Sequence, residues 1–183
     1  YEGPVFSGQR ALLRAGKGIH QAFFPECGEP LTVGAGDKFF AHVYLDPKDP
    51  PKAVMLQFHV GGGWSRRANW GDADAIGFGR KGTTEKVQMG KLPAAGQWVR
   101  LEVDAARLGL QPGTKIAGEA FTLFDGTAWW DKAGQLSVND PARDPGQSLT
   151  AWEESERALG KESAAPQVIK DLLKADLAKR SDT

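Results

Sequence analysis

The chain has 183 residues, enough for one well-filled β domain with an appendage or for two small units. Lys and Arg number 23, as do Asp and Glu, so the formal net charge is zero. This balance argues against a nucleic-acid-binding protein, because such proteins carry a basic excess. The single cysteine, Cys27, excludes an intrachain disulfide and a cysteine-based metal cluster.

No apolar run approaches the ~18 residues that are needed to span a bilayer. No basic segment followed by an apolar one opens the chain, as it would in a signal peptide. The first residues already follow a strand pattern, so we expect the sequence to be part of a longer protein. We predict no membrane insertion.

Short segments with alternating apolar and polar residues fill the part of the chain before residue 139, and glycine and proline separate them. This pattern is typical of an all-β sandwich or barrel. The expected strands cover residues 7–15, 18–24, 31–33, 36–46, 53–60, 64–71, 87–92, 96–104, 116–124 and 127–131.

The strands at 36–46 and 53–60 are joined by residues 47–52, too few for a crossover helix, and are predicted to pair as an antiparallel hairpin. Strand alternation then gives the hairpin two different faces. The apolar face is expected in the core and includes Val54, Leu56 and Phe58. The polar face carries His42, Tyr44, Gln57 and His59.

The Asp125-Gly126 turn lies between two apolar runs and predicts a second hairpin, because both residues can adopt positive φ. Trp129 and Trp130 follow it in the same strand, so one should be buried and the other can be exposed. Trp98, at the start of another strand, is interpreted as a packing residue.

The residue pattern changes from strand-like to linker-like after Val138. We therefore predict a β-sandwich domain over residues 1–138 and a linker with a helical tail over residues 139–183. Thr150 and Glu153 have the spacing of a capping box for a first helix that ends at Gly160. Pro166 opens a second helix with one apolar face. That face contains Ile169, Leu172, Leu173 and Leu177. We expect the tail to dock on the sandwich or to lead into a following domain.

Five motifs occur in a fixed order, at residues 39–47, 55–59, 64–71, 96–103 and 120–126. As a set they resemble a domain of large exported planctomycete proteins that also carry planctomycete-type cytochrome c domains. The resemblance extends over residues 17–175. More distantly, the pattern is similar to galactose-binding-like jelly rolls and sandwich carbohydrate-binding modules. The resemblance implies an extracytoplasmic jelly-roll-like antiparallel β-sandwich that binds sugar.

The richest cluster of candidate binding residues lies in the strand at 64–71, and it consists of Trp64, Arg66, Arg67, Asn69 and Trp70. Aromatic rings stack on the apolar face of a pyranose, while Arg and Asn side chains form directional bonds to its hydroxyl groups. Regular alternation predicts that Trp64, Arg66 and Trp70 share a face. Together with His42, Tyr44, Gln57 and His59 they would form a shallow sugar site. The alternative is that one tryptophan is buried and the arginines pair with Asp72 or Asp74.

Metal binding and catalysis are further possibilities. His20, His42 and His59 have no spacing that fixes a third ligand for a transition metal. Asp37, Asp125 and Asp131 are candidates for a structural calcium site, because sandwich modules use carboxylates in this way. Glu102 and Glu119 could form a glycosidase pair on neighbouring strands. Both follow ordinary outward alternation, however, and no catalytic motif is present.

We therefore predict a non-catalytic carbohydrate-binding module of a larger extracytoplasmic protein, located in the periplasm or at the cell surface. Its expected partners are an oligosaccharide or polysaccharide and the neighbouring domains of the parent protein. Apart from the structural calcium ion, no cofactor is predicted. The alternative is a structural domain whose aromatic face docks those neighbouring domains.

Overall fold

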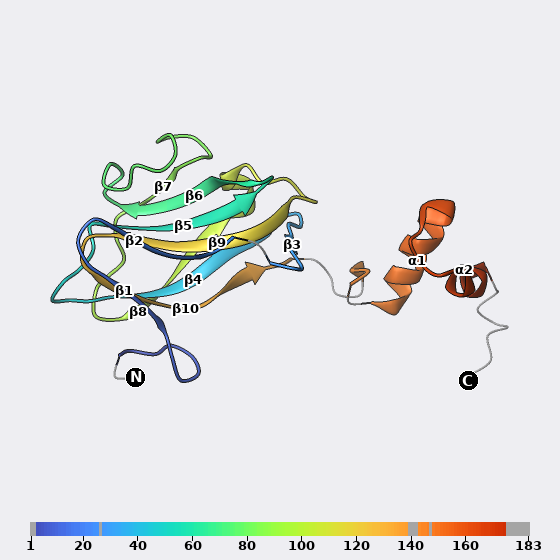
Figure 1. Cartoon of the computed structure of the whole chain (residues 1–183), viewed down its shortest axis with the longest axis horizontal. Helices are drawn as coiled ribbons and strands as arrows, with labels where there is room; N and C mark the ends of the chain where they lie inside the picture. Colours follow the sequence, from blue (N-terminus) through green and yellow to red (C-terminus); the bar gives the residue numbers. More distant parts are fainter. Residues whose placement is uncertain (1–2, 26, 139–142, 147, 175–183) are drawn as a thin grey trace. The chain divides into compact units, whose positions relative to one another are not determined.

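The computed structural model describes residues 3–25, 27–138, 143–146 and 148–174. The chain separates into two compact units, Tyr1–Val138 and Asn139–Thr183. The first unit consists of two stacked β-sheets, and the second contains short helices (Figure 1). The predicted fold class, a jelly-roll-like antiparallel β-sandwich followed by a short helical region, is confirmed.

Sheet A contains four strands in the order β1-β10-β4-β8, all antiparallel to their neighbours. Their bounds are β1 Leu12–Ala15, β10 Thr127–Leu136, β4 Lys38–Leu45 and β8 Trp98–Asp104. A 3-10 helix, η1 (Ala105–Leu108), follows β8. The N-terminal segment before β1 lies on the side of sheet A that faces away from sheet B (Figure 1).

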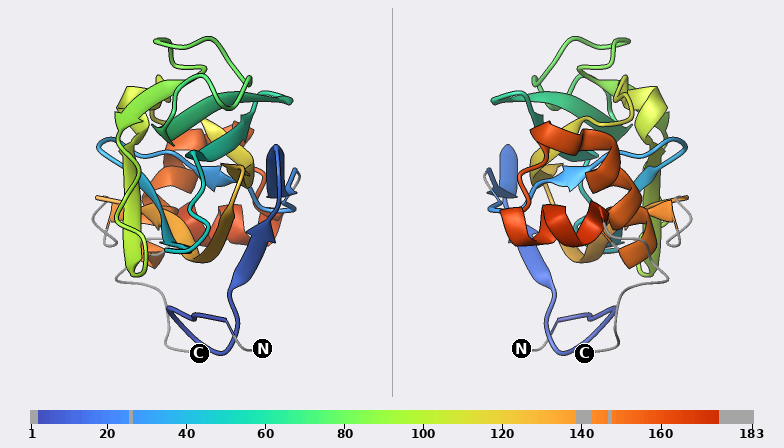
Figure 2. Two further views of the ribbon diagram at one scale, coloured as in Figure 1. Left: turned by 90° about the vertical axis from the view of Figure 1, so that its left-hand side faces the viewer. Right: turned by 90° about the vertical axis from the view of Figure 1, so that its right-hand side faces the viewer.

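Sheet B has the order β2-β9-β5-β6-β7, with the short strand β3 also paired to β9. Its strands are β2 Ile19–Phe24, β3 Leu31–Thr32, β5 Ala53–Val60, β6 Gly63–Gly71, β7 Val87–Gly90 and β9 Lys115–Phe124. All of these pairs are antiparallel except β6 with β7. The connection between these two parallel strands, residues 72–86, extends beyond the sheet (Figure 2).

The core fills the space between the two sheets, because alternate residues of each strand point inward. Phe39 of β4 packs against Phe58 of β5, with ring centroids 4.7 Å apart. The predicted inward positions of β5 are confirmed. Val54, Leu56 and Phe58 are almost completely buried in this core. Trp130 is also buried there, and Trp129 lies on the opposite face, as predicted.

Both predicted hairpins are wrong. Strands β4 and β5 lie in different sheets, as do β9 and β10, so each short connection crosses from one sheet to the other. The physical reason is that each of these strands turns one apolar face to the core, and packing against the opposite sheet buries that face as well as side-by-side pairing does. The polar positions of β4 and β5 therefore lie on opposite outer faces of the sandwich.

The second unit contains α1 (Leu149–Leu159), η3 (Gly160–Glu162) and α2 (Gln167–Lys174). The predicted capping box is wrong: the N-cap is Ser148, whose side chain accepts a hydrogen bond from the backbone N–H of Ala151. The predicted end of α1 at Gly160 is confirmed. Leu177 lies outside the described residues.

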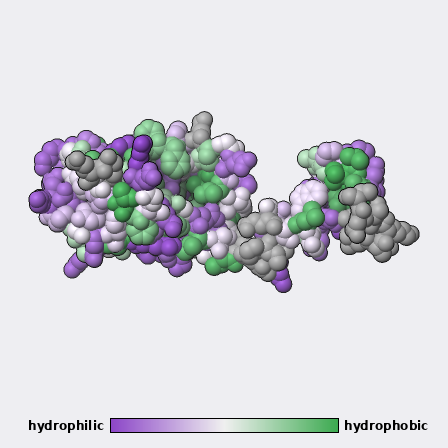
Figure 3. All heavy atoms as spheres, turned by 90° about the horizontal axis from the view of Figure 1, so that it is seen from below, coloured by the Kyte–Doolittle hydropathy of each residue, from purple (hydrophilic) through white to green (hydrophobic). Residues whose placement is uncertain are grey.

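Hydrophobic side chains gather on the surface of this helical unit (Figure 3). Those that are exposed are Leu149, Leu159, Val168 and Leu172. Within the described part of the chain, no helix is both long enough and apolar enough to cross a membrane.

Candidate functional site

A cleft of about 190 Å³ opens on the outer face of sheet B. It is lined by Gln21 and Phe23 from β2, Ala120 from β9, Gln57 from β5, Trp64 and Arg67 from β6, and Phe78 from the loop after β6. Four of the predicted strands and one loop thus contribute to it. We refer to this feature as the sheet B cleft.

The strand register explains why these side chains meet. Phe23 pairs with Ala120, Ala120 pairs with Gln57, and Gln57 pairs with Arg67. One row of side chains therefore crosses four adjacent strands on a single face. Ala120 is the smallest residue in the row, and its methyl group leaves the hollow between Phe23 and Gln57.

A β-bulge at Ser65 decides which tryptophan faces the cleft. His59 pairs with Trp64, while the preceding residue, Phe58, pairs with Arg66. The extra residue on β6 reverses the alternation at this point. Trp64 is therefore on the same face as Arg67 and not, as predicted, with Arg66.

Trp70 lies on the inner face of β6 and is 8% exposed, in the hydrophobic core. The prediction that Trp64, Arg66 and Trp70 form one row is wrong. Burial of one tryptophan, the other possibility considered, is confirmed. The pairing of the arginines with Asp72 or Asp74 is wrong: Asp74 binds Lys81 instead.

Asn69 lies on the outer face of β6, but it is fully buried and does not line the cleft. Its Nδ2 donates a hydrogen bond of 2.9 Å to Oε1 of Gln88 on the parallel strand β7. Asn69 therefore helps to attach β7 to β6 and is not available to a ligand in the cleft.

The polar floor of the cleft is held by a hydrogen-bond network centred on Arg67. Nε of Arg67 donates to Oε1 of Gln57 at 2.8 Å, and its Nη atoms donate to the backbone carbonyls of Glu85 and Trp64. Gln57 in turn donates to Oγ1 of Thr122 at 2.7 Å and to Oε1 of Gln21 at 3.2 Å. These bonds fix the side chains before any ligand arrives.

Burial lowers the pKa of Arg67, and the carboxylate of Glu85 opposes this shift. A guanidinium nevertheless stays charged at neutral pH because its ordinary pKa is far above that range. The cleft therefore combines one fixed positive charge with two amide side chains.

Aromatic rings form the walls of the cleft. Trp64 meets Phe23 edge to face, with centroids 6.1 Å apart, and meets His59 in the same manner at 5.3 Å. Phe23 is 56% exposed, and Trp64 is half-buried. His59 supports the tryptophan from the side but does not itself line the cleft.

Phe78 is positioned by the loop between β6 and β7. Ile76, two residues earlier, is buried against Met55 and Ala53 of β5, and its carbonyl accepts a hydrogen bond from Nζ of the buried Lys86. Gly79 adopts a φ of 73°, where a side chain would meet the backbone of Glu85. These features hold the ring of Phe78 about 6.0 Å from the guanidinium of Arg67.

His42 and Tyr44 lie on the outer face of sheet A, away from this cleft. Phe6 of the N-terminal segment stacks on His42 with centroids 3.8 Å apart, and His42 is only 8% exposed. Tyr44 packs against Trp98 and Trp129. The predicted joint surface of His42, Tyr44, Gln57 and His59 is therefore wrong, because β4 and β5 belong to different sheets.

The three aspartates proposed for calcium do not converge, because they lie at different points along β10. Asp125 is in the turn before it, Asp131 is in its middle, and Asp37 is near its other end. Asp131 accepts bonds from the N–H groups of Phe6 and Ser7, and Asp37 accepts one from Gly34. Within the described ranges, no group of three or more His, Cys, Asp or Glu could hold a metal ion.

Glu102 and Glu119 do not form the pair that was considered for catalysis. Glu102 is on β8 in sheet A, where it binds Lys38 at 2.9 Å and Arg100 at 3.1 Å. Glu119 is on β9 in sheet B. Its predicted outward orientation is wrong, because it lies opposite Phe58 on the inner side of that sheet.

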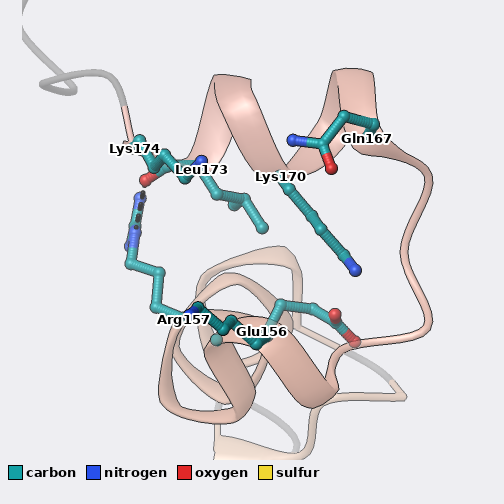
Figure 4. Close-up of a pocket in the computed structure, with 8 residues that line it drawn as sticks. Glu156, Arg157, Gln167, Lys170, Leu173 and Lys174 are labelled. Atoms are coloured by element: carbon teal, nitrogen blue, oxygen red, sulfur yellow. Dashed lines mark hydrogen bonds between the residues drawn. The ribbon is translucent and has the colours of Figure 1, made fainter.

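A second cavity, of about 570 Å³, lies between α1 and α2 in the helical unit (Figure 4). Arg157 reaches from α1 to the backbone carbonyl of Leu173 at 3.0 Å, and Lys170 extends from α2 toward α1. Arg157 also binds Glu153, and Ser163 donates to Glu156. The bond from Arg157 to Leu173 joins the two helices, and the residues that line the cavity include no aromatic side chain.

Sequence reasoning missed Gln21, Phe23 and Phe78 as cleft residues. Alternation in β2 places Gln21 and Phe23 on one face, but only the sheet order reveals that β2 is two strands away from β5. Phe78 lies in a loop, where no periodic pattern gives a signal. In comparisons with known proteins, no family model and no curated protein sequence matches this chain.

Proposed function

We propose that residues 1–138 form a non-catalytic carbohydrate-binding module of a larger extracytoplasmic protein and that the sheet B cleft takes one sugar ring. The observation that carries this proposal is the combination of Trp64 and Phe23 as walls with Arg67 and Gln57 as a fixed polar floor. The resemblance to exported planctomycete proteins supports the extracytoplasmic location.

The chemistry of the cleft suits a sugar. The C–H face of a pyranose packs on an aromatic ring, and its hydroxyl groups need donors and acceptors at the ring edge. Three N–H groups of Arg67 donate within the described chain. A guanidinium has five such donors, so the group retains donors for a ligand. Gln21 and Gln57 add amide groups that both donate and accept.

The size of the cleft limits what it binds. At about 190 Å³ it is smaller than the typical small-molecule site of about 300–1,000 Å³. One sugar residue therefore enters the cleft while the rest of an oligosaccharide lies along the surface of sheet B. This arrangement favours recognition within or at the end of a longer glycan chain.

A glycan array followed by calorimetric titration of the best ligand tests the proposal. Trp64→Ala and Phe23→Ala should each reduce affinity at least tenfold. Phe24→Ala is the matched control, because Phe24 is adjacent in β2 and 50% exposed but points to the other side of the sheet. Trp70→Ala is unsuitable for this purpose, because that ring is in the core.

Equal glycan affinity in Trp64→Ala and the unmodified chain would contradict the proposal. Absence of any glycan binding would also contradict it. The rival role, docking of a neighbouring domain, would then be supported by self-association or domain capture that Trp64→Ala abolishes.

A further inference from the structure

Glu119 occupies an unusual position for a carboxylic acid. It lies on the inner side of sheet B, paired with Phe24 of β2 on one side and with Phe58 of β5 on the other. Its Oε1 atom is buried and has no hydrogen-bond partner among the described residues. A buried polar atom without a partner is rare, because its lost hydration is not replaced. Glu119 therefore requires an explanation beyond packing.

Strand pairing ends in both sheets near Glu119. Strand β1 pairs with β10 only as far as Trp130, and beyond that point β10 forms a bulge between Asp131 and Gly134. Strand β2 ends at Phe24. Between these edges lie two adjoining cavities of about 410 and 360 Å³. Both cavities are lined by Phe24, Glu119 and Ala133, and we refer to them together as the intersheet cleft.

The walls of the intersheet cleft are mainly apolar. Phe39, Phe58 and Ile116 line the first cavity, and Leu12, Phe121 and Trp130 line the second. Nε1 of Trp130 is a second buried polar atom that lacks a partner in the described chain. Phe24 and Leu31 are half exposed, so the cleft is open to solvent on this side. Its size is that of a typical small-molecule site.

We propose that the intersheet cleft binds an uncharged amphipathic small molecule, whose apolar body packs on the phenylalanine walls and whose single hydroxyl or carboxamide group bonds to the carboxyl of Glu119. Such a head group supplies the donor and the acceptor that a protonated carboxyl needs. An oxygen on the same ligand can also accept the N–H of Trp130.

Burial raises the pKa of Glu119 to about 8, so the group is mainly neutral at pH 7. The other titratable groups that line the cleft are Cys27 and Glu29 in the first cavity and Arg10, Asp131 and Lys132 in the second. Arg10 and Lys132 are balanced by Glu29 and Asp131, so these groups give the lining no net charge that would favour a charged ligand. A neutral head group avoids the cost of a buried charge.

This site is separate from the sheet B cleft and does not depend on sugar binding. Adjacent residues of β2 distinguish the two sites, because Phe23 lines the outer cleft and Phe24 lines the inner one. Phe24→Ala should weaken binding of the amphipathic molecule without affecting glycans, and Phe23→Ala should do the reverse. Failure of one proposal therefore leaves the other intact.

The test is calorimetric titration of the full chain with 1-octanol and with octanamide at pH 7. We expect saturable binding to the unmodified chain and to Glu119→Gln, which keeps both a donor and an acceptor. Glu119→Leu should bind at least tenfold more weakly. Since Leu removes a buried polar group, this variant should remain folded, and its thermal unfolding is measured alongside.

Raising the pH from 7 to 9.5 should weaken binding to the unmodified chain, as Glu119 loses its proton, while Glu119→Gln stays unaffected. The Gln variant keeps every other group that lines the cleft, so it is also the control for effects of pH elsewhere in the protein. The proposal is overturned if Glu119→Leu binds octanamide as well as the unmodified chain does. Tighter binding of octylammonium than of octanol would overturn it as well.

Discussion

The two outer faces of the sandwich carry similar side chains but differ in what covers them. On sheet A, Phe6 stacks on His42, and Asp131 holds the backbone of the N-terminal segment in place. On sheet B, the loop at 72–86 covers the face only in part, and Trp64 and Phe23 stay accessible. Aromatic and polar residues on a strand therefore do not by themselves mark a binding face. What matters is whether another segment of the same chain already occupies it.

The largest expected effect is a loss of stability when a tryptophan on the inner face of sheet B is replaced, compared with one on its outer face. Trp70→Ala removes a core side chain and should lower the free energy of unfolding by about 3–5 kcal/mol. Trp64→Ala should lower it by about 1–2 kcal/mol, because a half-buried ring contributes less than a fully buried one. Urea denaturation of both variants measures the difference. Equal losses would mean that Trp64 is a structural residue and that the open face of sheet B resembles that of sheet A.

The strand positions could be predicted from the sequence because burial of one face imposes a period of two residues. This period places Val54, Leu56 and Phe58 in the core, and the structure confirms that prediction. Strand pairing could not be predicted in the same way. A short connection such as residues 47–52 permits either a hairpin or a crossing between sheets, and the alternation is the same in both.

The candidate site was predicted only in part. Trp64, Arg67 and Gln57 meet in the sheet B cleft, but His42 and Tyr44 do not. The bulge at Ser65 reverses the side-chain alternation with no glycine or proline at that residue to signal it. Contacts across four strands depend on the order of the sheet, which no local pattern encodes.

The next largest effect is expected when the N-terminal segment that covers the outer face of sheet A is released. Asp131→Ala removes the carboxylate that accepts hydrogen bonds from the N–H groups of Phe6 and Ser7. Hydrogen bonds to a charged group contribute about 1.5–3 kcal/mol, and we expect a loss of stability in this range. Hydrogen exchange of residues 3–10 should accelerate. Asp131→Asn keeps an acceptor and should lose less, while glycan affinity should be unchanged in both variants.

Phe6→Ala tests the stacked ring itself. Full burial of a phenylalanine side chain contributes about 1.5–3 kcal/mol, and Phe6 is 42% exposed, so we expect a loss of about 1–2 kcal/mol. Phe6→Tyr, which retains the ring, is the control. Phe6→Ala could instead create a new ligand site over His42 and Trp98. In that case the two faces would differ only in that the N-terminal segment covers one of them.

The smallest expected effect concerns the turn by which the chain passes from sheet B to sheet A. Asp125 accepts a hydrogen bond of 2.8 Å from the N–H of Gly18 and pairs with Lys52 at 2.9 Å. The N–H of Gly18, followed by Lys52, lowers the pKa of this carboxyl. A carboxyl whose pKa is depressed in the folded state stabilises the protein above its unfolded pKa of about 3.9. This contribution disappears as the pH falls through the lower folded value.

Asp125→Asn should therefore be less stable than the unmodified chain near neutral pH, and the difference should shrink as the solution is acidified below about pH 4. Asparagine tolerates the positive φ of 57° at this position, so the backbone of the turn is not strained by the change. Unfolding midpoints measured between neutral and acidic pH check the prediction. A difference that stays constant with pH would show that the hydrogen bond, and not the charge, stabilises this turn. Because the Lys52 side chain is largely in solvent, the effect should also weaken in high salt. Neither outer face is involved, so glycan binding at the sheet B cleft should be the same in both proteins.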